Sequence, residues 1–379
     1  MRLASLLKRK GGIIPNVFHS AHGRRALVST LDWPFRKGFS YKHNNLTEAL
    51  VMAKAFQELA YDVDIINYDS DLEFDYGAYN VVFGFGNPLE KLFLKEARRR
   101  PRAILYCNSQ HVPTLTALSM QRLEDVYRKR GVWLPASARI GRGGIAEGAA
   151  DGLLVLGNEI VADSFRHLTR NPIHSLPLCF LKTVEAGPIL AERPLDEARR
   201  HFIWFAGSGL VHKGLDLVLE AIAAHPDLHL HVYGDFRREA GFVQAYHHEL
   251  FECPNIHVEG FLAIESPAFP AALTRSAFMI CPSCSEGSCS SVLNICGNGG
   301  LVPIITAQCG IDIGDFGILV GSTTVQAVEA ALFEAGGLGL DELDRRQRAS
   351  AAHFQNVHSL ERFQERMTWS IQDILGRPQ

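Results

Sequence analysis

The stretch FIWFAGSGLVHKG, residues 202–214, decides the fold. It opens with large apolar residues typical of a buried strand, continues through a loop of small residues, and leads into a helical pattern. Gly207 and Gly209 allow the backbone to approach a ligand closely, and Lys213 supplies a cation beside it. A strand, a glycine loop and a helix in this order predict an α/β unit with an anion site. The alternative is a glycine turn beside a solvated lysine.

Short apolar runs separated by helical segments continue on both sides of this stretch. Runs of strand length occur at 24–30, 63–68, 80–84, 103–107, 152–157, 228–233, 255–259, 277–281 and 301–306. Such alternation predicts parallel sheets covered by helices on both faces. The pattern stops in LPLCFLKTVEAGPILAERPL, residues 176–195, where three prolines are typical of an interdomain connection.

The predicted fold class is α/β, with two doubly wound Rossmann-like domains that face one another. At 379 residues the chain is too long for one ordinary compact core. We expect an N-terminal domain at 1–180, a linker at 181–200, a C-terminal domain at 201–358, and a final helix at 359–379 able to pack back on the N-terminal domain. Two facing domains imply a cleft.

The charge distribution is uneven between the two halves. Residues 1–180 carry 24 Lys and Arg against 17 Asp and Glu, whereas the rest carries 14 against 24. The basic first half, with Lys8–Lys10 and Arg98–Arg102, suggests a partner such as a phospholipid surface or a phosphorylated acceptor, although such imbalances are often only solvated faces. We expect no nucleic-acid partner. With no apolar run of spanning length and no signal peptide, we expect a cytoplasmic protein, able to sit at the inner membrane face.

The stretch CPSCSEGSCSSVLNIC, residues 281–296, holds four of the eight cysteines. Its spacing matches no common set of metal or iron–sulfur ligands. Cys281 ends a predicted strand, and Cys289 and Cys296 share one stripe of a predicted helix, so buried thiols are favoured over a metal. What remains is a second strand that leads through a Ser-Glu-Gly-Ser turn into a helix N-terminus, which suits an anion such as a diphosphate.

The order of these motifs resembles a known family. After the FxGxxxxxKG stretch come VYGD (232–235), EGF (259–261), PSxxEG (282–287) and GLVPII (300–305). This series resembles the C-terminal domain of GT-B glycosyltransferases, specifically the large retaining family 4, or glycosyl transferases group 1. The similarity covers about residues 200–320. It is looser over 24–180, where it rests on the order of elements and on a histidine-bearing loop after Tyr106.

The resemblance implies roles for residues of both glycine loops. Lys213, with the backbone of Gly207, Ser208 and Gly209, would clamp the nucleotide diphosphate and stabilise the charge on this leaving group. Glu286 is similar to the first glutamate of the family's EX7E motif, which accepts hydrogen bonds from the donor sugar. The remaining donor contacts that the resemblance implies are the amides of Gly287 and Ser288 and a base cradle at Gly260 and Phe261.

Two positions depart from the family pattern. The second EX7E glutamate, which normally holds the ribose hydroxyls, is Asn294 in this chain. An asparagine still forms hydrogen bonds to a diol but gives up charge-assisted ones, worth about 1 kcal/mol or more. The family's arginine in the first loop is replaced by Ser208 or Gly209. These changes imply weaker donor binding, an unusual donor or lost activity.

In the N-terminal half the resemblance points to His111 and Gly38. His111 follows a predicted strand where relatives present a histidine to the donor sugar, although an ordinary loop histidine is the alternative. Gly38 lies in RKGFS, residues 36–40, in place of a mobile loop that relatives fold over the acceptor and phosphate. His43, Asn45 and Asn158 are weaker candidates; Asn158 can equally be a helix cap.

The resemblance implies a retaining, metal-independent glycosyltransferase in polysaccharide biosynthesis. Its donor would be a nucleotide-sugar co-substrate, its acceptor a glycan or a lipid-linked molecule, and it would need no cofactor. Two alternatives stay open. One is a GT-B nucleotide-sugar epimerase, which would need further acid and base carboxylates, and the other is a non-catalytic nucleotide- or sugar-binding relative, which Asn294 makes plausible.

Overall fold

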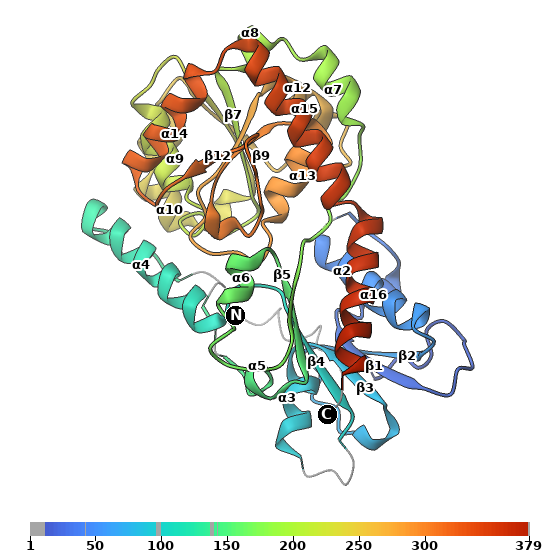
Figure 1. Ribbon diagram of the computed structural model, residues 1–379. Coiled ribbons are helices and arrows are strands. Elements are labelled where there is room, and N and C mark those ends of the chain that lie inside the picture. The colour runs from blue at the N-terminus through green and yellow to red at the C-terminus, as the bar shows by residue number, and fades with distance from the viewer. Residues whose placement is uncertain (1–11, 42, 96–99, 137–139, 142, 378–379) are drawn as a thin grey trace.

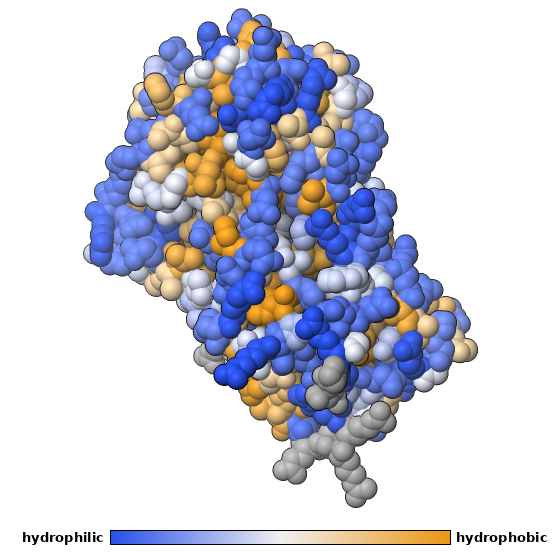
Figure 2. Space-filling model, in the orientation of Figure 1, coloured by the Kyte–Doolittle hydropathy of each residue, from blue (hydrophilic) through white to orange (hydrophobic). Residues whose placement is uncertain are grey.

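The computed structural model describes residues 12–41, 43–95, 100–136, 140–141 and 143–377, and these form two lobes (Figure 1). Of the basic runs noted above, residues 8–10 and 98–99 lie outside the described ranges. Within those ranges no helix combines the length and the apolar character needed to span a membrane. The face drawn in Figure 2 is mostly hydrophilic, with smaller apolar patches.

The first lobe is built on a six-stranded parallel sheet in the order β2-β1-β3-β4-β5-β6. Most of its strand residues are buried, so helices cover both faces. The strands are β1 (Arg25–Thr30), β2 (Asp62–Asn67), β3 (Val81–Gly84), β4 (Arg102–Cys107), β5 (Gly152–Leu156) and β6 (Ile173–Leu176). The helices are α1 (Trp33–Lys37), α2 (Asn44–Glu58), η1 (Tyr76–Ala78), α3 (Asn87–Leu94), α4 (Val112–Arg130), α5 (Ala146–Ala149) and α6 (Glu159–Asp163).

The second lobe repeats this plan with the sheet order β12-β11-β10-β7-β8-β9, again parallel throughout. The strands are β7 (His201–Phe205), β8 (His229–Tyr233), β9 (Ile256–Gly260), β10 (Phe278–Cys281), β11 (Val302–Thr306) and β12 (Ile318–Val320). The helices are α7 (Ala186–Glu192), α8 (Leu195–Ala198), α9 (Leu215–Ala223), η2 (Phe236–Arg238), α10 (Ala240–Ala245), α11 (His247–Phe251), α12 (Ala268–Arg275), α13 (Ser290–Gly299), η3 (Ala307–Cys309), α14 (Val325–Gly337) and α15 (Leu340–Val357).

These two helix-covered parallel sheets confirm the predicted fold class. The sequence did not predict the edge strands β6 and β12, which have only four and three residues. In the second sheet, β7 and β10 lie side by side although far apart in sequence, and the strand order runs in opposite directions from this pair. The carboxyl ends of β7 and β10 therefore meet at the switch point where ligands bind in doubly wound folds.

The C-terminal helix α16 (Leu360–Gly376) returns to the first lobe, where it lies beside α2 (Figure 1). Its apolar face, with Phe363, Met367, Ile371 and Ile374, is fully buried in the main core cluster. Arg102 on β4 donates to the carbonyl of Ile374 at 2.7 Å. The predicted return of the chain is confirmed.

Helix α4 belongs to the first half of the sequence but packs on the second lobe (Figure 1). Leu123 and Val126 of α4 join the hydrophobic cluster of that lobe. Arg122 forms a buried ion pair with Asp216 on α9, and Arg130 pairs with Glu220 at 2.7 Å. Helix α4 thus ties the two lobes together on one side of the molecule.

Candidate functional site

The loops after β7 and β10 converge, as the two glycine motifs predict. The amide of Cys284 donates to the carbonyl of His212 at 2.9 Å, and the Ser283 hydroxyl oxygen lies 3.1 Å from the same carbonyl oxygen. Gly214, at φ +71°, has no room for a side chain, because a Cβ there would lie 2.6 Å from Pro282. A backbone position at positive φ in such close contact requires glycine.

Lys213 and Glu286 meet where these loops join. The Lys213 ammonium donates to Glu286 Oε1, and both side chains are about 7% exposed. The Ser283 hydroxyl donates to the same oxygen at 3.0 Å, and His212 Nε2 lies 3.6 Å from it. A buried lysine–glutamate pair is costly to desolvate, so hydrogen bonds of this kind are needed to hold it. The structure thus brings together Lys213 and Glu286, two of the three residues that the sequence singled out for catalysis, the third being His111.

The first glycine loop presents amides to a carboxylate that the sequence did not single out. Gly207 and Ser208 are exposed, and Gly209 is buried at φ +77°. The amide of Gly209 donates to Glu239 Oε1 at 2.6 Å, and that of Leu210 donates to the Glu239 carboxylate at 3.3 Å. These amides therefore already bind an anion, the carboxylate of Glu239.

The second glycine loop is pressed against the first lobe. A Cβ at Gly287 would lie 2.6 Å from the carbonyl oxygen of Asn108, so glycine is needed for the lobes to meet here. The Ser288 hydroxyl is buried and has no hydrogen-bond partner among the described residues. Three side-chain bonds join the lobes around this point: Gln110 to Gln308 at 2.5 Å, Ser285 to Gln110 at 2.7 Å, and Asn158 to Asp312 at 2.8 Å. The site is therefore closed in this structure.

His111 faces residues of its own lobe. Its Nε2 lies 3.4 Å from Glu147 Oε2, and its ring meets the ring of His167 edge-on at 5.1 Å between centroids. Burial and the neighbouring His167 lower the pKa of His111, so the neutral ring is favoured. Gln110, the residue before it, reaches the second lobe. The predicted contact of His111 with a donor sugar stays a prediction.

Asn294 has a clear set of protein partners. Its Oδ1 accepts from the amide of Leu181 at 2.8 Å, and its Nδ2 donates to Asn44 at 3.1 Å. One turn later, Asn298 accepts from the amide of Thr183 at 2.8 Å. These asparagines fix the interdomain linker to α13. The role predicted for Asn294 is to hold the ribose of the donor. To do so, Asn294 would have to give up at least part of this hydrogen-bond network.

Further predicted positions are exposed or half-exposed and lie in loops or near the ends of elements. Gly260 ends β9 at φ +79°, and Phe261 is 76% exposed, a large apolar ring open to solvent. Gly38 is exposed at φ +88°, where it caps α1. His43 accepts from the amide of Asn45 and so caps α2. The structure does not bring these positions into contact with the Lys213–Glu286 pair through any hydrogen bond among the described residues.

A cavity of about 460 Å³ lies between α4 and the first glycine loop. Its lining is largely apolar, with Leu123, Leu134, Val211 and Phe242, and it includes Gly209 and Glu239. His212, the neighbour of Lys213, also lines it. A ligand bound to the amides of Gly209 and Leu210 would therefore have an enclosed, mostly apolar space beside it.

Two facing parallel α/β lobes, a switch-point site in the second and a last helix that returns to the first define the GT-B fold of glycosyltransferases. No protein-family model and no curated protein sequence matches the chain.

Solved structures share this fold over most of the chain. Sucrose-phosphate synthase from Thermosynechococcus elongatus matches with a TM-score of 0.64 and 14% identity, covering 93% of this chain and 99% of that one. A glycosyltransferase from Rickettsia africae matches at 0.59 and 12%, covering 94% and 100%. HepE from Anabaena, in complex with UDP-glucose, matches at 0.58 and 10%, covering 92% and 99%.

Proposed function

We propose that the protein is a retaining glycosyltransferase that moves a sugar from a nucleotide-sugar to a glycan or a lipid-linked acceptor. The observation that carries this proposal is the buried Lys213–Glu286 pair at the carboxyl ends of β7 and β10. A cation and a carboxylate at this place can each bind a different part of a nucleotide-sugar. The ammonium suits the diphosphate, and the carboxylate suits the sugar hydroxyls.

In this reaction the bond from the anomeric carbon to the diphosphate oxygen breaks, and a bond to the acceptor oxygen forms on the same face. The acceptor proton passes to a diphosphate oxygen. Lys213 stabilises the negative charge that grows on the leaving group, a contribution that is larger in a closed, dry site. When the diphosphate draws Lys213 toward itself, Glu286 becomes available to accept hydrogen bonds from the sugar.

Three further observations support a nucleotide-sugar donor. HepE, which shares the fold, was solved with UDP-glucose. The cavity beside Gly209 gives room for a bound molecule next to the loop amides that the Glu239 carboxylate occupies in this structure. The closed contact of Gly287 with the first lobe would shield a reactive donor from water. We further propose that the acceptor is anionic or sits at an anionic membrane surface of the cytoplasm, because the first half of the chain is basic.

Two measurements test the proposal. A thermal-shift panel of nucleoside diphosphates should raise the melting temperature for one base, since a ligand that binds only the folded state stabilises it. Labelled nucleotide-sugars should then show slow hydrolysis or transfer. Substituting Lys213→Met should cut turnover at least about a hundredfold, equivalent to roughly 2.7 kcal/mol of transition-state stabilisation.

Removing one partner of a buried pair can also unfold the protein. The double variant Lys213→Met, Glu286→Gln removes both charges and should keep the fold, as circular dichroism would show, while turnover is lost. The matched control is Lys54→Met, at an exposed lysine on α2, which should leave turnover unchanged. Full turnover in the double variant would reject the site.

One observation favours a second candidate, a non-catalytic nucleotide- or sugar-binding protein. Asn294 stands where the family has its second carboxylate, so that carboxylate is missing from the ribose site. The side-chain amide of Asn294 instead holds the linker through Leu181. Such a protein would show the thermal shift with a nucleoside diphosphate but neither hydrolysis nor transfer. An epimeric sugar product would instead identify a nucleotide-sugar epimerase.

A further inference from the structure

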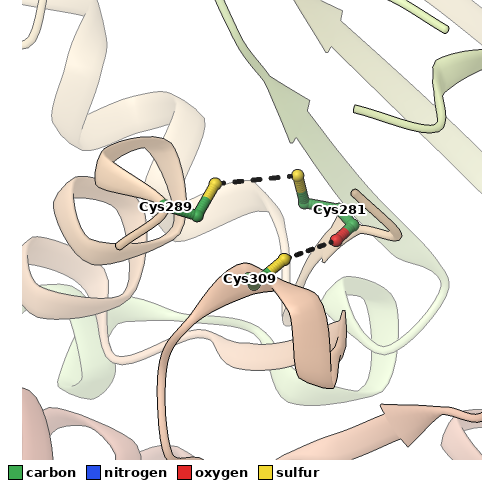
Figure 3. Close-up of side chains that lie close together, drawn as sticks. All are labelled: Cys281, Cys289 and Cys309. Carbon is green, nitrogen blue, oxygen red and sulfur yellow. Dashed lines mark hydrogen bonds between the residues drawn. The ribbon is translucent and has the colours of Figure 1, made fainter. Parts of the chain in front are cut away.

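Three buried thiols meet directly behind the second glycine loop (Figure 3). Cys281 ends β10, Cys289 caps α13, and Cys309 ends η3, and all three side chains are fully buried. Their sulfur atoms lie within 4.8 Å of one another. The sequence placed Cys281 and Cys289 on separate elements as packing residues and did not foresee Cys309 as their neighbour. We call these residues the thiol triad.

The spacing of the thiol triad is close to that of ligands on one ion. A zinc–sulfur bond is about 2.3 Å long, so two sulfurs on one ion lie about 3.8 to 4.0 Å apart in tetrahedral or trigonal geometry. The sulfurs of Cys281 and Cys289 are 3.9 Å apart. Cys309 Sγ lies 3.2 Å from the carbonyl oxygen of Cys281, on the same side of the strand end. A small rotation about each Cα–Cβ bond would bring all three sulfurs onto a common centre.

The ligand set selects the kind of ion. Among the described residues no histidine or carboxylate completes this group, so the donors are three sulfurs alone. Thiolate sulfur binds soft ions such as Cu(I) and Zn(II) and binds Mg(II) or Ca(II) poorly. We infer that Cys281, Cys289 and Cys309 form a binding site for a single thiophilic d10 cation of the Cu(I) or Zn(II) type.

The surroundings moderate the negative charge that three thiolates would carry. The Lys213 ammonium lies 4.0 Å from Cys289 Sγ. Cys289 also stands at the N-terminus of α13, a helix of ten residues, where the helix dipole favours negative charge. Both features reduce the cost of ionising the thiols in a buried place.

An ion here would act on the loop that carries Glu286. Cys281 and Cys289 bracket residues 282–288, so a shared ion would pin both ends of that loop to η3. Gly287, two residues before Cys289, packs against Asn108 of the first lobe, and Gly310, next to Cys309, packs against Gly287, so the triad lies close to the contact between the lobes. Opening of the lobes would therefore uncover the route by which an ion reaches the sulfurs.

Metal titration of the reduced full-length protein without oxygen tests the inference. Cu(I) and Zn(II), each added alone in competition with a chromophoric chelator, should give one bound ion per chain for at least one of them. X-ray absorption at the metal edge should show only sulfur neighbours, at about 2.3 Å. These readouts do not depend on glycosyl transfer, so their failure leaves the proposed function untouched.

Substitution separates the thiol triad from the other cysteines. Cys309→Ser and Cys281→Ala should each lower the affinity at least about a hundredfold. Cys296→Ser is the matched control, because Cys296 is equally buried on the same helix but outside the triad, and it should keep the affinity. The inference is overturned if neither ion binds, if binding survives Cys309→Ser, or if the reduced protein forms a Cys281–Cys289 disulfide with glutathione disulfide and binds no ion.

Discussion

At the scale of single residues, Glu239 sets a condition on donor binding. Its carboxylate occupies the amides of Gly209 and Leu210, in the loop where the resemblance places a diphosphate. Two anions cannot share the same amide protons, because each would lose its hydrogen bonds and repel the other. A diphosphate that binds this loop must first displace Glu239.

We therefore expect Glu239→Ala to bind a nucleoside diphosphate more tightly, by about tenfold or roughly 1.4 kcal/mol. Isothermal titration with the base found in the thermal-shift panel measures this. Glu252→Ala is the control, since Glu252 is an exposed carboxylate that contacts His247 and His248, and it should bind as the parent does. Weaker binding in Glu239→Ala would mean that the carboxylate orders the loop instead of competing for it.

The meeting of Lys213 and Glu286 could be predicted from sequence. Each residue follows a strand by a short, glycine-bearing loop, and parallel neighbouring strands bring such loops to one edge of the sheet. Glu239, Gln110 and Cys309 could not be found in this way. Their contacts join segments distant in sequence, and a polar residue in a loop gives no sign of which partner it will meet.

At the scale of helices, α4 depends on a buried charge pair. Arg122 and Asp216 are each about 4% exposed, and burial raises the pKa of Asp216 while Arg122 opposes that rise. Arg122→Met should lower the free energy of unfolding by about 3 kcal/mol or more, because Asp216 would be left buried without its cation. Urea unfolding measures the change. Arg128→Met, at an exposed arginine paired only within α4, should cost less than about 0.5 kcal/mol.

The strands β7, β8 and β9 carry an array of four stacked or hydrogen-bonded histidines. His201 pairs across the sheet with His229, and His231 with His257. His201 Nδ1 lies 2.9 Å from His231 Nε2, and Glu259 and Arg275 complete this network. Burial and the neighbouring positive charges lower the pKa of His201 and of His231 to about 4.

Because an unfolded histidine titrates near pH 6.5, the unfolded chain binds more protons than the folded one between about pH 6.5 and 4. Stability should be fully present above this window and fall as the pH drops through it. Scanning calorimetry measures how far the melting temperature falls between pH 7 and pH 5. This fall should be about 2 to 4 °C smaller for His231→Gln than for the parent, the difference expected for about 1 kcal/mol of unfolding free energy. His225→Gln, at an exposed histidine outside the array, should follow the parent curve.

The central strands were predictable, whereas the edges were not. Buried on both faces, β3 and β10 are continuous apolar runs. The edge strand β6 mixes polar and apolar residues, and β12 is apolar but only three residues long, so neither gives a clear strand pattern. The sequence also did not predict that α4, which belongs to the first half of the chain, packs on the second lobe. The apolar stripe of a helix shows that the helix is packed on one side but not which element it packs against.

At the scale of the whole molecule, Gly287 sets how closely the lobes approach. A Cβ at this position would lie 2.6 Å from the Asn108 carbonyl oxygen, and backbone cannot move aside as a flexible side chain can. Gly287→Ala should therefore hold the lobes apart and raise the radius of gyration, which small-angle X-ray scattering measures. Gly207→Ala is the matched control, because nothing lies within 4 Å of a Cβ there. Equal radii in both variants would count against a closed resting arrangement.

The return of α16 to the first lobe has a consequence for synthesis on the ribosome. Residues 360–376 are translated after the whole of the second lobe, yet their buried face completes the core around α2 and β5 of the first. Domains usually finish folding in the order in which they leave the ribosome. Here the lobe that is made first must wait, with part of its apolar surface exposed, until residues 360–376 have been made and cover it.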